Sequence, residues 1–93
     1  MKKVYEDFLE LLEKECGIKF DKNEIFGEED GDGNSVIIPI MDYEFGLGLC
    51  QKNDRIETVE LLMIEGEDDP LLCVKMAARI ERVIDIPIKI YPL

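Results

Sequence analysis

The sequence predicts an α+β fold in which two helices pack on one face of a largely antiparallel sheet of four or five strands. Two segments, residues 2–16 and 70–85, repeat apolar residues at steps of three and four, which is the period of an amphipathic helix. Between them, residues 35–64 alternate apolar and other side chains or are rich in β-branched residues, as strands are. A chain of 93 residues has the size of one domain, so we expect residues 1–93 to share one core.

The first helix is expected to run from Lys2 to Cys16, with its acidic residues on the side opposite its apolar stripe. Gly17 follows, and glycine at this position adopts the left-handed conformation that ends many helices. Residues 18–21 alternate and fit either a short strand or an extended connection. Ile25 and Phe26 then form an apolar anchor, so the expected order is helix, short strand or connection, three strands, helix, strand.

Three strands are expected to form an antiparallel meander. The segment 36–40 is rich in valine and isoleucine, and Pro39 within it removes a backbone donor, which favours a sheet edge or a bulge. Residues 43–50 alternate at the strand period, and residues 56–64 are rich in Val, Thr and Ile. The sequence Lys-Asn-Asp-Arg at 52–55 predicts a hairpin turn between these two strands.

The hairpin turn also predicts a register. If Asn53 and Asp54 are the two loop residues and the ladder is regular, the predicted pairs are Phe45 with Leu62, Leu47 with Glu60, and Leu49 with Thr58. Both faces of the sheet are then partly apolar, although a slip of one residue would exchange them. Two helices, each ~10 Å across, cover only one face of such a sheet, so we expect leftover apolar surface that suits a homodimer or a protein partner.

The second helix has clear boundaries in the sequence. Asp69 is a preferred N-cap residue, and Pro70 suits the first helical position because its missing N–H needs no partner there. The apolar stripe continues through Ile80 and stops near Asp85. Residues 86–91 then alternate isoleucine with other residues, and the prolines around this last strand favour a sheet edge.

Charge is the strongest compositional signal. The net charge is −11, and residues 21–69 hold fifteen acidic against three basic residues. Such a surface repels nucleic acid and anionic lipid and attracts basic proteins. No apolar run approaches the ~18 residues of a membrane span, and the N-terminus turns acidic where a signal peptide needs apolar residues, so we expect a cytoplasmic protein that binds neither nucleic acid nor membrane directly.

Two acidic clusters raise the question of metal binding. Asp30, Asp32 and Asn34 match the first, third and fifth positions of a calcium loop, but Ser35 and Met41 stand where that loop needs glycine and glutamate. The acidic residues of 65–69 would join this cluster only if the two loops met in space. The simpler interpretation is that these acidic residues complement the positive N-terminal end of the following helix. We therefore predict no metal site, and Cys16, Cys50 and Cys73 are interpreted as small buried residues because no histidine or paired cysteine accompanies them.

No combination of residues predicts catalysis. The chain has no histidine, its only serine and threonine are Ser35 and Thr58, and no glycine-rich phosphate loop enters a helix. The carboxylates lie in polar, glycine-rich segments, whereas catalytic acids sit in clefts that shift their pKa. We expect a protein that is not an enzyme, with no catalytic residues and no cofactor.

An acidic central segment in a chain without a recognisable set of catalytic residues suggests a small inhibitor or immunity-type protein. It would neutralise a basic partner, such as a nuclease toxin, by presenting carboxylates where that partner holds phosphates. The residues predicted to contact the partner are Glu28, Glu29, Asp30, Asp32, Asp42, Glu44, Asp54 and Glu57. Two alternatives stay open: a homodimeric acidic chaperone for a secreted or partly unfolded client, and a phage-type mimic of nucleic acid.

Overall fold

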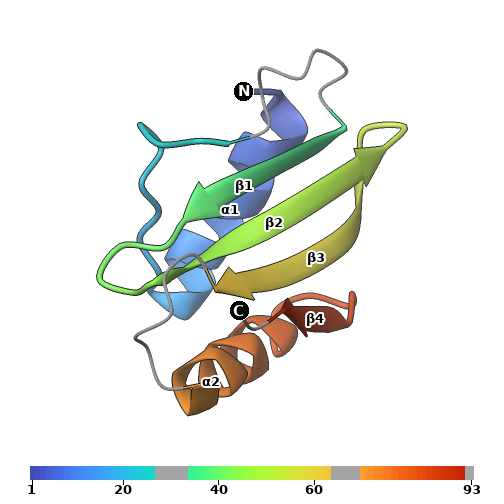
Figure 1. Cartoon of the computed structure of the whole chain (residues 1–93). Helices are drawn as coiled ribbons and strands as arrows, with labels where there is room; N and C mark the ends of the chain where they lie inside the picture. The colour runs from blue at the N-terminus through green and yellow to red at the C-terminus, as the bar shows by residue number, and fades with distance from the viewer. Residues whose placement is uncertain (27–33, 64–69, 92–93) are drawn as a thin grey trace.

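A computed structural model of the chain describes residues 1–26, 34–63 and 70–91. These residues form two helices and one four-stranded sheet (Figure 1). In chain order the elements are α1 (Lys3–Cys16), β1 (Ser35–Pro39), β2 (Phe45–Lys52), β3 (Arg55–Met63), α2 (Pro70–Glu81) and β4 (Ile88–Tyr91). The predicted α+β class and the predicted order of elements are confirmed. Neither of these helices has the length and apolar content needed to cross a bilayer.

The strands lie side by side in the order of the chain, β1-β2-β3-β4. The first three are antiparallel, and β4 pairs in parallel with β3 after the crossover through α2. The two strands that contain or adjoin proline, β1 and β4, are the two edges, as predicted. Residues 18–26 do not form a strand. They run along the outer edge of β1 and make two single bridges, Phe26 with Ile37 of β1 and Phe20 with Ile40, the residue that follows β1.

The core lies between the helices and one face of the sheet. Alternate residues of the first three strands point into it, and so do the apolar stripes of both helices. The strands contribute Val36, Ile38, Phe45, Leu47, Leu49, Val59, Leu61 and Met63, and the helices contribute Tyr5, Leu9, Leu12, Cys73, Met76, Ala77 and Ile80. In Figure 1, α1 crosses behind the sheet and α2 lies along the β4 side. The opposite face of the sheet carries no helix among the described residues.

The predicted hairpin turn is present, but the predicted register is wrong. Asn53 and Asp54 both have positive φ, 54° and 59°, as a type I′ turn requires, and Lys52 pairs with Arg55 across it. In the next two pairs, Gln51 lies opposite Ile56 and Cys50 lies opposite Thr58, so Glu57 is an extra residue in β3. This β-bulge shifts the rest of the ladder by one position.

The bulge determines which side chains of β3 face the helices. In the observed register, Phe45, Leu47 and Leu49 pair with Met63, Leu61 and Val59, and all six side chains are buried on the helix side. The regular register would have placed Val59 and Leu61 on the opposite face. That face instead carries Leu62 and Glu60 of β3, which pair with Gly46 and Gly48 of β2, so it is less apolar than the sequence suggested.

Side-chain hydrogen bonds hold the C-terminus of α1 and the segments around Gln51 of β2. Gly17 ends α1 with φ 68°, and the Arg79 guanidinium on α2 donates a hydrogen bond to the Cys16 carbonyl, one of the unpaired carbonyls at that helix end. Gln51, the one buried polar residue of the described part, donates to Asn34 Oδ1 at 2.8 Å and accepts from the Asp54 N–H at 3.0 Å. The Arg79 hydrogen bond joins α2 to the end of α1, and the two Gln51 hydrogen bonds join β2 to Asn34 and to the β2–β3 turn.

Candidate functional site

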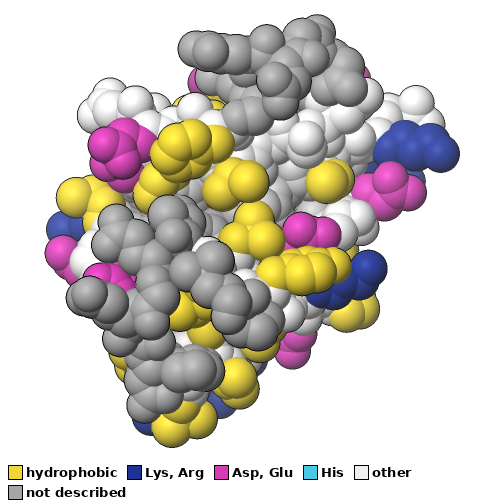
Figure 2. All heavy atoms as spheres, in the orientation of Figure 1, with side chains coloured by type: hydrophobic (Ala, Val, Ile, Leu, Met, Phe, Trp, Pro, Cys, Tyr) yellow, Lys and Arg dark blue, Asp and Glu magenta, His cyan; other side chains and the backbone are white. Residues whose placement is uncertain are grey.

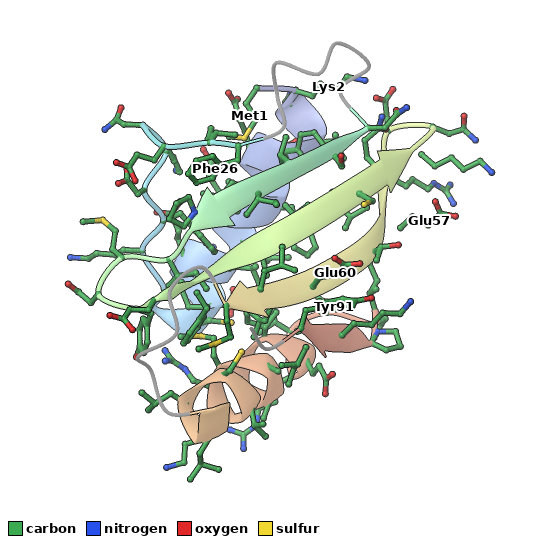
Figure 3. The ribbon with its side chains drawn as sticks, viewed as in Figure 1. Met1, Lys2, Phe26, Glu57, Glu60 and Tyr91 are labelled. Carbon is green, nitrogen blue, oxygen red and sulfur yellow. The ribbon has the colours of Figure 1, made fainter. Side chains whose placement is uncertain are left out.

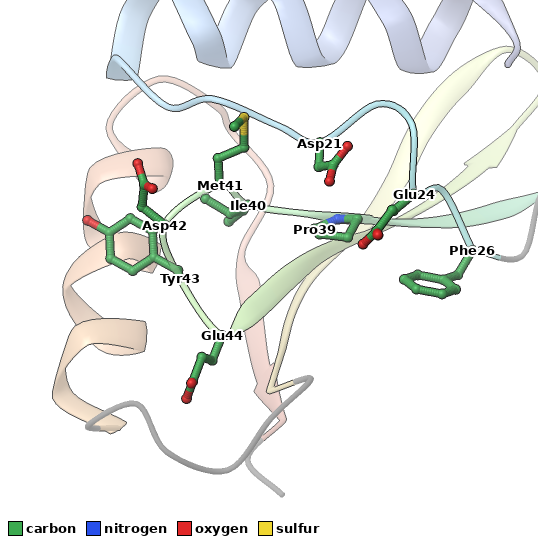
Figure 4. Close-up of a pocket in the computed structure, with 9 residues that line it drawn as sticks. All are labelled: Asp21, Glu24, Phe26, Pro39, Ile40, Met41, Asp42, Tyr43 and Glu44. Carbon is green, nitrogen blue, oxygen red and sulfur yellow. The ribbon is translucent and has the colours of Figure 1, made fainter.

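A hollow of about 430 Å³ opens at the end of the sheet where β1 turns into β2. One wall comes from the connection after α1, and the other comes from the end of β1 and the β1–β2 loop (Figure 4). We call it the acidic hollow; its lining residues are Asp21, Glu24, Phe26, Pro39, Ile40, Met41, Asp42, Tyr43 and Glu44. Its volume is within the range of ligand pockets, about 300 to 1,000 Å³.

Backbone hydrogen bonds hold the β1–β2 loop and the connection against each other. The Met41 N–H donates to the Lys19 carbonyl at 2.8 Å, and the Asp21 N–H donates to the Pro39 carbonyl at 2.9 Å. Asp42 has φ 71°, a left-handed conformation that aspartate tolerates better than most residues, and it allows the loop to reverse. The two walls of the hollow are therefore positioned by the main chain rather than by flexible side chains.

Apolar side chains stand exposed around the acidic hollow. The exposed fractions are 50% for Phe26, 48% for Met41 and 37% for Tyr43. The ring of Tyr43 lies 4.9 Å from the ring of the buried Phe45, centroid to centroid, which ties the exposed ring to the core. Exposed rings supported in this way provide rigid apolar contact area, the type of surface that dominates binding energy in protein interfaces.

Carboxylates give the hollow its charge. Four of the lining residues are acidic, Asp21, Glu24, Asp42 and Glu44, and none of the described lining residues is lysine or arginine. Lys22, which follows Asp21 in the sequence, is held elsewhere: its Nζ lies 2.7 Å from Glu13 Oε1, and this hydrogen bond raises the pKa of Lys22. Arg79, in an adjoining hollow, donates to the C-terminus of α1. Asp21, Glu24 and Asp42 can therefore attract a cation from outside the chain, whereas Glu44 already interacts within it.

The structure separates the predicted contact residues that it describes. Asp42 and Glu44 line the acidic hollow, whereas Asp54 lies in the β2–β3 turn and Glu57 forms the bulge. These groups are at opposite ends of β2, whose eight residues span about 23 Å at ~3.3 Å per step. The other four predicted residues, Glu28, Glu29, Asp30 and Asp32, lie outside the described residues.

Sequence reasoning missed two acidic residues of the hollow. Asp21 and Glu24 belong to a connection whose place in space depends on its pairing with β1, which no local pattern encodes. A signal was nevertheless present. Ile25 and Phe26 stand out as apolar residues in an otherwise polar stretch, and Phe26 reaches the sheet through its bridge to Ile37.

The helix-free face of the sheet is a second surface to consider. Both Figure 2 and Figure 3 view this face; Figure 3 labels Phe26, Glu60 and Tyr91, and Figure 2 shows apolar side chains scattered between polar ones. Leu62 lies over Gly48, where an added Cβ would meet Leu62 Cδ1 at 3.1 Å. Tyr91 of β4 is 46% exposed. Leu62 thus fills the space that the glycine leaves, and this surface is shallow.

Neither metal binding nor thiol chemistry gains support from the described residues. Within 1–26, 34–63 and 70–91, no three His, Cys, Asp or Glu side chains are grouped to hold a metal ion. Asn34, the fifth position of the calcium-loop pattern, directs its Oδ1 to Gln51. Burial raises the pKa of the Cys16 thiol; Arg79 partly opposes this effect and Glu15 adds to it. Burial and then Glu60 and Glu57 raise the pKa of the Cys50 thiol, so both thiolates are disfavoured.

Comparison with known proteins leaves the chain without an assigned relative. It matches no protein-family model, and neither a curated protein nor a solved structure matches it at a significant level.

Proposed function

We propose that this chain is a small cytoplasmic protein of the inhibitor or immunity type, which binds and neutralises a basic protein partner such as a nuclease toxin. The acidic hollow supports the proposal most directly, because it places carboxylates beside three exposed apolar side chains, on two segments that backbone hydrogen bonds hold together. The chain acts by binding and carries out no chemistry of its own.

The physical roles of the two kinds of residue differ. Carboxylates at the hollow attract a basic partner and orient it during the encounter, an effect that weakens as salt screens the charges. Phe26, Met41 and Tyr43 then lose water on contact and supply the lasting part of the affinity. A nuclease that grips phosphates with lysines and arginines presents the complementary charge.

Two matched triple variants test where the partner binds. The first, D21N/E24Q/D42N, removes three charges from the acidic hollow. The second, D54N/E57Q/E60Q, removes three charges near the other end of the sheet, so both proteins have a net charge of −8. Glu44 is left unchanged because it already interacts within the chain. Asparagine tolerates the left-handed conformation at 42 and 54, so neither variant strains the backbone.

The experiment is a tagged pull-down from the native cell lysate at low and at moderate salt, followed by mass spectrometry and then by affinity measurement with the purified partner. We expect a basic protein that is released as salt rises. The hollow variant should bind it about 10- to 100-fold more weakly, since each lost charge pair costs about 0.5 to 1 kcal/mol. The control variant should stay within about threefold of the wild type. Equal losses for the two variants would contradict binding at the hollow.

The helix-free sheet face favours one other candidate, a homodimeric acidic chaperone that holds a client against this face. Ile37, Leu62 and Tyr91 are the apolar residues concerned. Clients held by apolar contact should stay bound at high salt, and sedimentation should show a dimer. A monomer whose partner is released by salt would leave the inhibitor proposal as the better account.

A further inference from the structure

Within the proposed function, and resting on it, we infer that the acidic hollow receives arginine side chains from an extended segment of the basic partner. The inference starts from the arrangement of the lining side chains rather than from their charge alone. Figure 4 shows Asp42 and Tyr43 together at one end of the hollow and Glu24 and Phe26 at the other, with Pro39 and Ile40 between them. Each exposed ring therefore shares its end of the hollow with a carboxylate.

A ring beside a carboxylate suits arginine better than lysine. The guanidinium group is planar, so its flat side stacks on an aromatic ring while its N–H groups at the edge donate to carboxylate oxygens. An ammonium group has no flat side and keeps its water more strongly. The methylene stem of arginine also lies well against an exposed apolar side chain such as Met41.

The elongated arrangement favours a segment over a single side chain. A hollow of about 430 Å³ with two ring and carboxylate pairs has room for more than one side chain. In an extended peptide, residues two apart point to the same side. An Arg-x-Arg segment can thus present two guanidinium groups to the same surface.

Synthetic tripeptides test the inference without knowledge of the partner. The probe is the acetylated and amidated peptide Arg-Leu-Arg, compared with versions in which both arginines are replaced by lysine or by citrulline, the uncharged isostere. Binding is followed by the ¹H–¹⁵N NMR signals of the whole chain at low salt. We expect saturable shifts at Glu24, Phe26, Asp42 and Tyr43, binding by the lysine peptide that is at least about threefold weaker, and none by the citrulline peptide.

Substitutions at Tyr43 separate stacking from charge. Tyr43→Phe keeps the ring and should keep the affinity for Arg-Leu-Arg, whereas Tyr43→Leu keeps apolar bulk but should weaken binding about three- to tenfold. Asp42→Asn should weaken it by a similar factor. The dispersion of the amide signals verifies in the same samples that each variant is folded.

The outcomes distinguish this inference from the proposed function. Equal binding of the arginine, lysine and citrulline peptides, no binding at all, or shifts centred on Asp54 and Glu57 would each overturn arginine recognition at the hollow. If a basic partner is nevertheless retained in a salt-sensitive manner, the proposed function stands and only the recognition mode is wrong. If the peptide binds as expected but no basic protein is captured, the hollow is an arginine site and the proposed function fails.

Discussion

Deleting the bulge residue Glu57 should leave the fold intact, although deletions inside strands are usually severe. In the observed ladder, Gln51 pairs with Ile56 and Cys50 with Thr58, and Glu57 has no counterpart on β2. Without Glu57 the same pairs form a regular ladder that continues from an unchanged two-residue turn. Every core residue of β3 keeps its face, so we expect a change in the free energy of unfolding of less than about 1 kcal/mol.

Deletion of Glu60 is the matched control, because it also removes one acidic residue from β3 but lies beyond the bulge. A single ladder can then no longer bury both Val59 and Leu61, which are fully buried in the native structure. If the ladder becomes regular, Val59 moves to the helix-free face and Thr58 enters the core. Losing a buried valine costs about 1.5 to 3 kcal/mol, and burying an unpaired hydroxyl costs about 1 to 3 kcal/mol more.

The assay is urea denaturation followed by circular dichroism, with the free energy of unfolding extrapolated to water. We expect a loss of roughly 3 to 5 kcal/mol for the Glu60 deletion, a large part of the ~5 to 15 kcal/mol that stabilises a typical domain. Cross-strand NMR contacts between Leu47 and Leu61 should persist in the Glu57 deletion. Similar losses for the two deletions would refute the idea that the bulge alone sets the register.

Two further predictions concern Gln51 and Cys50. Gln51→Leu removes the donor to Asn34 and the acceptor of the Asp54 N–H, so it should lower the free energy of unfolding in urea by about 2 kcal/mol. Asn34→Ala removes one of these two hydrogen bonds and should lower it by about half as much. An unchanged free energy of unfolding for Gln51→Leu would contradict this prediction. Cys50 should react with iodoacetamide at pH 8 more slowly than in the urea-unfolded chain, because burial and then Glu60 and Glu57 raise its pKa. Glu60→Gln should speed the reaction, and no acceleration would count against the role of Glu60. Because the pKa of the folded state is the raised one, the folded chain loses stability as the pH rises from the ordinary pKa of a thiol through the raised one.

Much of the fold follows from local patterns in the sequence. The apolar stripe before Gly17 predicts α1, and Pro70 with the stripe that follows predicts α2, because helix periodicity and helix ends depend on neighbouring residues. The turn at Asn53 and Asp54 was predicted for the same reason, since positive φ at both positions is a property of those residue types. Prolines at 39 and 87 place their strands at the sheet edges because they cannot donate to a neighbour.

The candidate site was predictable only in part. Asp42 and Glu44 could be chosen from charge, but charge alone also chose Asp54 and Glu57, which lie at the far end of β2. Asp21 and Glu24 reach the site only because the connection after α1 pairs with the outer edge of β1. Residues that are far apart in the sequence become neighbours through such pairing, and local sequence patterns do not reveal it.

The amino-acid sequence by itself determined the helices, the meander, the edge strands and the strongly acidic character, all of which depend on composition or on residues a few positions apart. The tertiary structure decided the register and the site. One residue, Glu57, is accommodated as a bulge because burying Val59, Leu61 and Met63 against the helices outweighs a local break in the ladder. The acidic hollow exists because backbone hydrogen bonds join two remote segments around exposed rings, an arrangement that forms only when the whole core is packed.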